Sequence, residues 1–364
     1  MRSRRNSRSS CGAKSNDNDG DSDDGKGAEQ MKIDDGMKFD PTGIADAARL
    51  AEANGYDGVW TAETSHDPFL PIAVAAGATE KLEFGTGIAV AFARNPMNLA
   101  VLANDLQHLT KGRFMLGLGS QIKPHITKRF SMPWSHPAPR MRELILAIRA
   151  IWATWETGEK LDFRGEFYSH TLMTPFFVPE KNPYGNPKIL LAAVGELMTE
   201  VAGEVGDGLL VHGFSTERYI REVTLPALER GAAKAGKSRA DLTVSYPGFV
   251  VTGATDADVT AASRAVRQQI AFYGSTPAYR PVLELHGWRD LQTELNTLSK
   301  RGEWVKMGEL IDDDVLNAFA VVAPLGGVAA EVKARFGDVV DRFSFYMPYK
   351  MGPSEWKTLL ASFR

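Results

Sequence analysis

The sequence predicts a (β/α)₈ barrel of the TIM type, with insertions after the fourth strand and after the seventh strand. Eight short apolar segments alternate with helical patterns across roughly 330 residues. Strict alternation of strands and helices calls for a parallel sheet, and eight such units match a closed barrel. A doubly wound open sheet is the alternative. It normally uses fewer units, and no G-x-G-x-x-G fingerprint follows the first predicted strand.

The predicted strands are apolar runs bounded by glycine, proline or charged residues. The clearest is Leu82–Ala91 (LEFGTGIAVA), which is too short for a typical helix and follows a charged turn. In chain order the predicted strands span residues 31–33, 56–61, 82–91, 113–118, 188–194, 208–211, 242–251 and 341–347.

The predicted helices have apolar residues at helical spacing and recognisable ends. The first begins with Asp40 as the N-cap and Pro41 at the first helical position, and Gly55 ends it. The other helices are expected after Pro71, at 95–111, at 138–156, from 196, at 216–235, at 256–273, at 326–336 and from Pro353.

Two stretches break this alternation and predict the insertions. Residues 161–187 are rich in proline, glycine and aromatic residues, and residues 274–313 carry Trp288 and Trp304. Aromatic side chains of this kind suit an apolar organic ligand, but they would equally pack the insertions against the barrel.

The composition is that of a globular protein and excludes several function classes. Of 364 residues, 43% are apolar and 24% are charged, and the net charge of −3 gives no electrostatic case for nucleic acid or an anionic membrane. The only cysteine is Cys11, so one chain can form neither a disulfide framework nor a thiolate metal site. No apolar run approaches the roughly 20 residues that span a bilayer. We therefore expect a cytoplasmic protein.

Residues 1–30 differ from the rest of the chain. Four arginines lie among serines in the first ten residues, and residues 17–29 are acidic and glycine-rich. Almost nothing there can be buried, and the apolar core of a signal peptide is missing. We expect a disordered tail or a mis-assigned start, followed by a single domain over residues 31–364. Nucleic-acid binding through the arginines is an alternative, although the formal charges of residues 1–30 cancel.

The polar segment Glu63–Asp67 follows the second predicted strand and is the main candidate for chemistry. The C-terminal ends of barrel strands (the mouth) hold the ligands in this fold, and Glu63, His66 and Asp67 can all hold or transfer protons. The alternative is a polar loop with a satisfied histidine. Sequence neighbours cannot form a Ser–His–Asp relay, and neither G-x-S-x-G nor H-E-x-x-H occurs, so we expect no serine hydrolase and no metal site.

Further candidates lie at the ends of other predicted strands. Glycines at 85, 87, 117 and 119 predict a close approach of the backbone to something flat, or else small residues in a crowded barrel layer. Gly195–Thr199 opens a helix directly after a strand, which makes a seat for phosphate with Thr199 as a hydroxyl donor. After the fourth strand, His125 is the other histidine expected at the mouth.

The motifs resemble one family. The run Lys111–Ser120 (KGRFMLGLGS) is very similar to the GRF-x-LGLG signature of the bacterial luciferase-like superfamily, and Asn54–Glu63 resembles its second-strand segment. Arg94–Leu109 looks like its third helix, and Ala202–Leu210 (AGEVGDGLL) is similar to its entry to the sixth strand. Residues 61–69 (TAETSHDPF) look most like the branch of actinobacterial oxidoreductases that use the deazaflavin coenzyme F420.

The resemblance implies a barrel that binds F420 or FMN at its mouth. It implies that His66 faces the reactive ring and assists proton transfer, with Glu63 as a second catalytic candidate. It implies a non-prolyl cis peptide behind the ring near Gly87–Ala89, and a phosphate-binding turn at Gly195 and Thr199. The remaining candidates are Gly87, Ile88, Ala89, Gly119 and Ser120 for the cofactor, and Lys123 and His125 for the substrate. Lys123 and His125 are also candidates, with Glu63, for the acid role.

The sequence departs from the family pattern at two positions and leaves rival functions open. FMN-dependent relatives often carry an arginine where this chain has Ser120, and several F420 enzymes carry a glutamate where it has Gln121 or Ile122. We expect an F420-dependent oxidoreductase acting on a small apolar substrate, in a pocket capped by residues 121–136 and 274–313. The alternatives are an FMN-dependent monooxygenase supplied by a separate reductase, and a non-catalytic flavin-binding protein. The resemblance also implies a homodimer.

Overall fold

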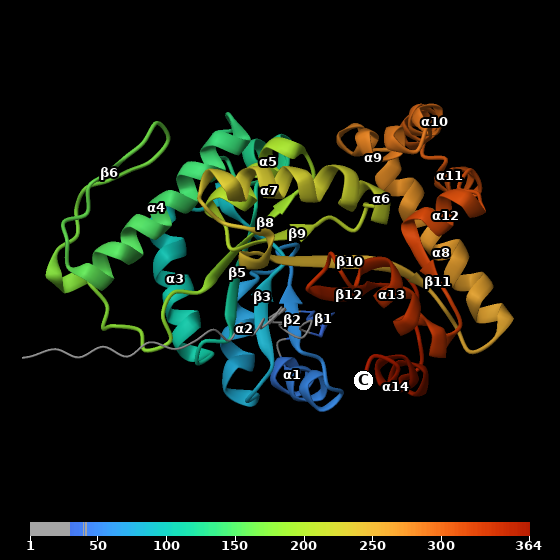
Figure 1. Cartoon of the computed structure of the whole chain (residues 1–364), viewed down its shortest axis with the longest axis horizontal. Helices are drawn as coiled ribbons and strands as arrows, with labels where there is room; N and C mark the ends of the chain where they lie inside the picture. Colours follow the sequence, from blue (N-terminus) through green and yellow to red (C-terminus); the bar gives the residue numbers. More distant parts are fainter. Residues whose placement is uncertain (1–29, 39, 41) are drawn as a thin grey trace, which may run out of the picture. The chain divides into compact units, whose positions relative to one another are not determined.

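Eight parallel strands close into a barrel in the computed structural model, which describes residues 30–38, 40 and 42–364 (Figure 1). The strands pair in the order β12-β1-β2-β3-β5-β8-β9-β10, and β10 pairs with β12 to complete the ring. The predicted barrel is therefore confirmed. The barrel strands are β1 (Lys32–Gly36), β2 (Gly58–Thr61), β3 (Glu83–Thr86), β5 (Phe114–Gly119), β8 (Lys188–Ala193), β9 (Gly208–Val211), β10 (Thr243–Val251) and β12 (Arg342–Tyr346).

The other elements surround or extend this barrel. Four further strands are short: β4 (Ala89–Val90), β6 (Phe163–Arg164), β7 (Ser169–His170) and β11 (Ala320–Val322). The α-helices are α1 (Ile44–Ala53), α2 (Phe69–Ala75), α3 (Pro96–Leu109), α4 (Pro137–Thr157), α5 (Glu196–Val205), α6 (Glu217–Tyr219), α7 (Leu225–Lys234), α8 (Asp256–Gly274), α9 (Arg280–Leu285), α10 (Arg289–Lys300), α11 (Trp304–Glu309), α12 (Asp313–Phe319), α13 (Val328–Phe336) and α14 (Pro353–Ala361). The short 3₁₀ and π segments are η1 (Ala76–Ala78), η2 (Ala91–Ala93), η3 (His125–Arg129), η4 (Pro175–Phe177), η5 (Ile220–Thr224), η6 (Arg239–Asp241), η7 (Pro277–Tyr279) and η8 (Leu325–Gly327).

Several helix boundaries differ from the prediction for local reasons. The first helix begins at Ile44 rather than after Asp40, because the Asp40 carboxylate accepts from the amide and hydroxyl of Thr42 and forms a turn before it. Pro41 lies outside the described residues. The second helix begins at Phe69, two residues before Pro71, because the Asp67 carboxylate accepts the Phe69 amide at 2.8 Å. The helix predicted over 216–235 is interrupted by the π segment η5.

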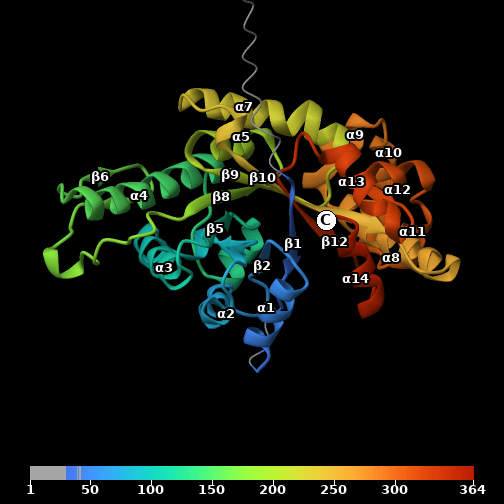
Figure 2. The same ribbon diagram turned by 60° about the horizontal axis from the view of Figure 1, so that its bottom comes forward.

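The second insertion is larger than predicted. Helix α8, expected to be a helix of the barrel, shares a hydrophobic core with α9 to α12 that includes Val266, Leu283 and Leu295. Helix α13 instead packs on the barrel, with Phe336 against Tyr246 and Phe343. In both views α8 to α12 gather around the far end of β10, away from α3 and α4 (Figures 1 and 2). The insertion therefore starts directly after β10.

The short strand β11 was not predicted and explains how this insertion is attached. It pairs in parallel with the last residues of β10, Phe249 to Val251, which extend beyond the barrel pairing with β9. Three residues after a helix are too few for a periodic signal, so the sequence does not reveal the strand. The extension places the insertion at the mouth.

Alternation along the strands identifies the side chains that face the barrel interior. Met115, Leu190 and Leu210 form one small core inside the barrel. Arg342 of β12 reaches across to Asp34 of β1, with two hydrogen bonds of 2.6 and 2.7 Å between buried side chains. Because side chains in a strand alternate between two faces, later residues in phase with these also face inward.

Three of the four strand glycines pack against the chain itself. A Cβ atom on Gly85 would lie 2.2 Å from the Trp60 ring, and one on Gly117 would lie 1.7 Å from the Thr86 carbonyl oxygen. One on Gly119 would lie 2.7 Å from Ile88. These three follow the crowded-layer alternative. Gly87 differs, because it is exposed and a Cβ there would make only ordinary contacts with Trp60.

The first insertion exposes some of its aromatic residues, while Phe163 and Tyr168 pack against the core. It contains the β6–β7 hairpin, and Phe176 and Phe177 are 89% and 68% exposed. These two residues therefore do not pack on the barrel, in contrast to one of the two sequence interpretations. The predicted tail up to residue 29, including Cys11, lies outside the described residues. Within the described residues, no helix is both long and apolar enough to cross a membrane.

Candidate active site

The loop after β2 is fixed at both ends and presents its apex to solvent. At its base, the Thr61 hydroxyl donates to the Pro68 carbonyl at 2.7 Å. The Asp67 carboxylate accepts the first amides of α2 and also contacts Arg94 at 3.3 Å. Between these anchors, Thr64 to His66 form an exposed bend. The predicted catalytic His66 therefore stands on a well-supported loop.

Glu63 ties this loop to the neighbouring strand. Its carboxylate accepts from the Val90 amide at 2.7 Å and from Arg94 at 2.6 Å, and its side chain is only 8% exposed. The Glu63 amide in turn donates to the Ile88 carbonyl at 3.2 Å. This arrangement gives Glu63 a positioning role between β2 and β4, and its catalytic role stays a prediction.

A cis peptide divides the third predicted strand, residues 82–91, into β3 and β4. Gly87–Ile88 is a non-prolyl cis bond, as the family resemblance implied, and it separates β3 from β4. The Gly87 amide donates to the Thr61 carbonyl at 2.7 Å. Gly87 is exposed, Ile88 is half-buried and Ala89 is fully buried. Only the first two can offer surface to a ligand.

The loop after β5 lies against the loop after β2. Arg129 of η3 donates to the Thr64 carbonyl, and the Ile88 side chain fills the space beside Gly119. The structure therefore brings Gly119 together with Gly87 and Ile88. Ser120 is half-buried and donates to the Gln121 carbonyl at 3.1 Å. The predicted substrate residues Lys123 and His125 are exposed.

The start of α5, the predicted phosphate seat, exposes Gly195 and buries Thr199. Gly195 is exposed and a Cβ atom there would meet nothing within 4 Å. The first amides of a helix have no intrahelical acceptor, so they are available to an anion. Thr199, however, is only 1% exposed, and its hydroxyl donates to the Gly195 carbonyl at 3.1 Å. The backbone, rather than this hydroxyl, supplies the donors.

A group of aromatic residues lies at the ends of β9, β10 and β12, and the sequence interpretation placed only His212 of this group at the rim of the mouth, without a role. We call this group the aromatic wall. The His212 ring stacks on Tyr279 with centroids 4.6 Å apart, and Tyr273 meets His212 edge-on at 5.0 Å. The rings of Phe249 and Tyr346 stack at 4.6 Å. The aromatic wall consists of His212, Phe249, Tyr273, Tyr279 and Tyr346.

Hydrogen bonds fix the protonation of this wall. The Phe214 amide donates to Nδ1 of His212, so the neutral ring carries its proton on Nε2, which lies 3.1 Å from the Tyr279 hydroxyl. Burial lowers the pKa of His212 to about 4 and raises the pKa of Tyr279 to about 12. Burial also raises the pKa of Tyr346. His212, Tyr279 and Tyr346 are therefore uncharged near neutral pH.

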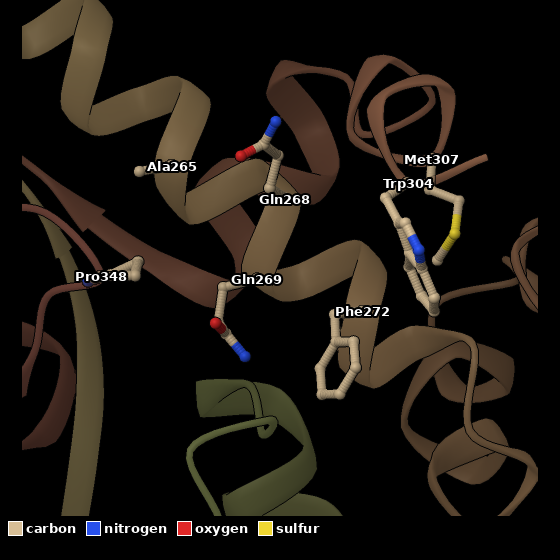
Figure 3. A pocket seen from close by; sticks show the side chains of 7 residues that line it. All are labelled: Ala265, Gln268, Gln269, Phe272, Trp304, Met307 and Pro348. Carbon is tan, nitrogen blue, oxygen red and sulfur yellow. The ribbon is translucent and has the colours of Figure 1, made fainter. Parts of the chain in front are cut away.

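A hollow of ≈ 370 Å³ lies between α8, α11 and Pro348, and no residue of the aromatic wall lines it. Phe272, whose ring is 5.6 Å from that of Tyr273, and Trp304, whose ring is 6.1 Å from that of Phe272, both line it. Figure 3 shows these rings beside Met307, with two glutamine side chains of α8 nearby. The lining residues are Ala265, Gln268, Gln269, Phe272, Trp304, Met307 and Pro348.

Comparison with known proteins decides the family. A model of the luciferase-like monooxygenase family matches residues 16–342. The chain belongs to this family. It is 57% identical over 316 residues to an uncharacterized protein of Mycobacterium tuberculosis, covering 87% of this chain and 93% of that protein. It is 28% identical to a 5,10-methylenetetrahydromethanopterin reductase of Methanolobus tindarius, covering 84% and 90% of the two chains.

The fold of this luciferase-like protein also matches solved structures. A coenzyme F420-dependent tetrahydromethanopterin reductase from Methanopyrus kandleri superposes with a TM-score of 0.73 at 20% identity, over 92% of this chain and 97% of the other. At this identity the similarity establishes the barrel and not the reaction.

The family pattern helps to explain which site residues the sequence reveals. Short motifs around β2, β3 and β5 indicated His66, Gly87 and Gly119, because glycines and clustered polar residues are visible in a single sequence. Tyr346 lies in phase with Arg342 on β12, but a single sequence does not say which face of a strand is inward. Among the described residues, no group of three histidine, cysteine or acidic side chains could hold a metal ion.

Replacing Glu63 distinguishes its two possible roles. Glu63→Ala leaves the buried Val90 amide and Arg94 without their shared acceptor, so we expect it to lower the free energy of unfolding by about 1–3 kcal/mol. Glu63→Gln keeps an oxygen in place and should cost less. Urea unfolding measures both. If Glu63 is instead a catalytic acid, the two variants will lose turnover equally while Glu63→Gln remains stable.

Proposed function

We propose that this luciferase-like protein is an F420-dependent oxidoreductase that transfers a hydride between the deazaflavin and a small apolar organic substrate. The observation that carries the proposal is the exposed Gly87, whose amide donates to Thr61 at the base of the supported loop of His66. One side of the mouth thus offers the exposed backbone of Gly87, and the aromatic wall occupies the ends of β9 and β12. A flat ring fits between such surfaces.

The residues present fit this cofactor at both of its ends. At the ring end, Gly87 has no side chain, and Ile88 offers a half-buried apolar surface next to Gly119. At the phosphate end, the exposed Gly195 and the first turn of α5 offer backbone donors. The Glu196 carboxylate is held by Arg230 at 2.7 Å, which offsets its charge beside this seat. Bound F420 would supply the hydride donor or acceptor, because that chemistry belongs to the cofactor.

The chain's own contribution is to hold His66 in place as the group that exchanges a proton with the substrate. His66 would exchange a proton with the substrate, since an imidazole takes and gives protons near neutral pH. Arg94 fixes its loop through Glu63 and Asp67. The sequence similarity to a reductase whose name specifies a methanopterin substrate supports a reductase over an oxygenase. Ser120, at the position where FMN-dependent relatives often have arginine, supports F420 over FMN.

Titration of the purified protein with F420 and with FMN tests this proposal. Trp60 packs against Gly85 and Gly87, so tryptophan fluorescence should report ring binding. We expect a dissociation constant for F420 in the micromolar range or below. For Gly87→Val, whose side chain would enter the ring position, the dissociation constant should be higher by roughly tenfold or more. Gly77→Ala is the matched control, because a Cβ there meets nothing within 4 Å.

Each other outcome points to a different function. Binding of FMN alone would replace the proposal with a two-component monooxygenase that needs a separate reductase. F420 binding without turnover of any alcohol, aldehyde or enone would indicate a non-catalytic binding protein. Failure of both cofactors to bind would refute the proposal.

A further inference from the structure

We propose that the paired hydroxyls of Tyr346 and Tyr273 bind an oxygen atom of the substrate, so that this site selects uncharged carbonyl compounds or alcohols over hydrocarbons of the same shape. The inference rests on the proposed function and extends it to the substrate class. It assigns a role to residues of the aromatic wall, which holds several uncharged hydrogen-bonding groups beside the cofactor position.

The wall faces the barrel interior at its mouth. On β9, His212 is two residues beyond Leu210, which belongs to the interior core, so His212 shares that inward face. On β12, Tyr346 is four residues beyond Arg342, which reaches into the interior to Asp34, so it is inward as well. Both residues stand at the C-terminal ends of their strands. This is where a barrel binds its substrate.

The hydroxyl pair has a proton to spare. The two phenol oxygens of Tyr346 and Tyr273 are 2.6 Å apart, so one of them donates to the other. Whichever accepts keeps its own O–H, because each phenol carries a single proton. Tyr279 repeats this pattern, since its hydroxyl accepts from Nε2 of neutral His212 and keeps its own proton. The wall can thus donate to an acceptor that comes from outside the chain.

The surroundings favour an uncharged oxygen acceptor. Phe249 covers one face of Tyr346, and the hydroxyl pair is flanked by the rings of His212 and Tyr279. Hydrogen bonds are stronger in such an apolar setting than in water. His212, Tyr279 and Tyr346 are uncharged near neutral pH and offer a carboxylate or phosphate no compensating cation, whereas a carbonyl or hydroxyl oxygen requires none. A donor aimed at an oxygen where negative charge develops also stabilises the transition state of hydride transfer.

The apolar remainder of such a substrate has a place to lie. Phe272, whose ring is 5.6 Å from that of Tyr273, and Trp304 line a hollow, and they are 50% and 51% exposed. An oxygen at the hydroxyl pair and an apolar group toward these rings would fix the substrate in one orientation. A neutral ketone, aldehyde or alcohol with a hydrocarbon body satisfies both parts.

Ligand discrimination in the cofactor-loaded protein tests the inference. The probes are cyclohexanone and acetophenone, each paired with its hydrocarbon counterpart, methylenecyclohexane or α-methylstyrene. We expect at least one ketone to bind roughly 10- to 100-fold more tightly than its counterpart, because a site built for a polar group penalises its absence. The carbonyl stretch of the bound, isotope-labelled ketone should fall to lower frequency, since it accepts a hydrogen bond.

Variants show whether the tyrosines are responsible. The double variant Tyr346→Phe/Tyr273→Phe should remove the discrimination and the frequency shift, and each single variant should lose part of both. Tyr184→Phe is the matched control, because Tyr184 is an exposed tyrosine of the first insertion and does not belong to the aromatic wall. Melting temperatures and F420 titrations accompany every variant. Equal binding of ketone and hydrocarbon by the wild type, or full discrimination by the double variant, would overturn the inference. Failure of the wild-type protein to bind F420 would instead overturn the proposed function.

Discussion

Replacing His66 by alanine should reduce turnover by roughly 10²- to 10⁴-fold, the range by which a positioned general acid or base accelerates a reaction. The loop that carries His66 is held by Thr61, Glu63 and Asp67, none of which depends on the imidazole. The variant should therefore keep its fold and its affinity for F420. Steady-state kinetics, together with fluorescence titration of the cofactor, measure the two effects separately.

A second histidine gives the control for this experiment. His108 lies on the exposed side of α3, where its ring is 6.0 Å from that of Tyr184, so His108→Ala should leave turnover within about twofold of the wild type. Unchanged turnover in His66→Ala would show that another group transfers the proton. Lys123 and His125, both exposed on the loop after β5, would then be the next residues to test.

The fold could be predicted because its signals are local and repeated. Each βα unit is recognisable as a short apolar run followed by a helical pattern, and few folds other than the barrel contain eight such units. The errors occur where a longer-range contact decides. Helix α8 has an ordinary amphipathic sequence, and only its partners α10 to α12 assign it to the insertion rather than to the barrel. Likewise, β11 exists because β10 extends past the ring.

The candidate site could be predicted only in part, for a related reason. Gly87 and His66 belong to compact motifs, so they are visible in the sequence. Tyr273 and Tyr346 are 73 residues apart and meet only because the second insertion returns to the end of β12. Their significance depends on a hydrogen bond and on the inward face of a strand, neither of which a single sequence specifies. Arg94 is a similar case, because its role follows from contacts with two residues of a different loop.

Replacing Arg342 by methionine should lower the free energy of unfolding by about 3–5 kcal/mol, the cost of leaving a buried charge without its partner. Arg342 and Asp34 are 4% and 0% exposed at their side chains, and the guanidinium also contacts Glu83. Trp60 donates to the same Asp34 carboxylate at 2.8 Å. Urea unfolding near neutral pH measures the loss. The double variant Arg342→Met/Asp34→Leu should be more stable than the single one, because it removes the unpaired charge.

The pH dependence of this loss follows from the pKa values of the two acids. Burial raises the pKa of Asp34, and Arg342 only partly offsets that rise. Burial also acts to raise the pKa of Glu83, but Arg342 and Lys32 outweigh it, so the pKa of Glu83 lies below its ordinary value. A lowered pKa in the folded state stabilises the wild type above the ordinary pKa, and this stability is lost as the pH falls through the folded value. The Arg342→Met variant lacks that contribution, and protonation of Asp34 relieves its unpaired charge. The difference between wild type and variant should therefore shrink on acidification from about pH 7 to about pH 4, below the ordinary pKa of Glu83. A difference that grows would mean that Arg342 acts through packing and not through charge.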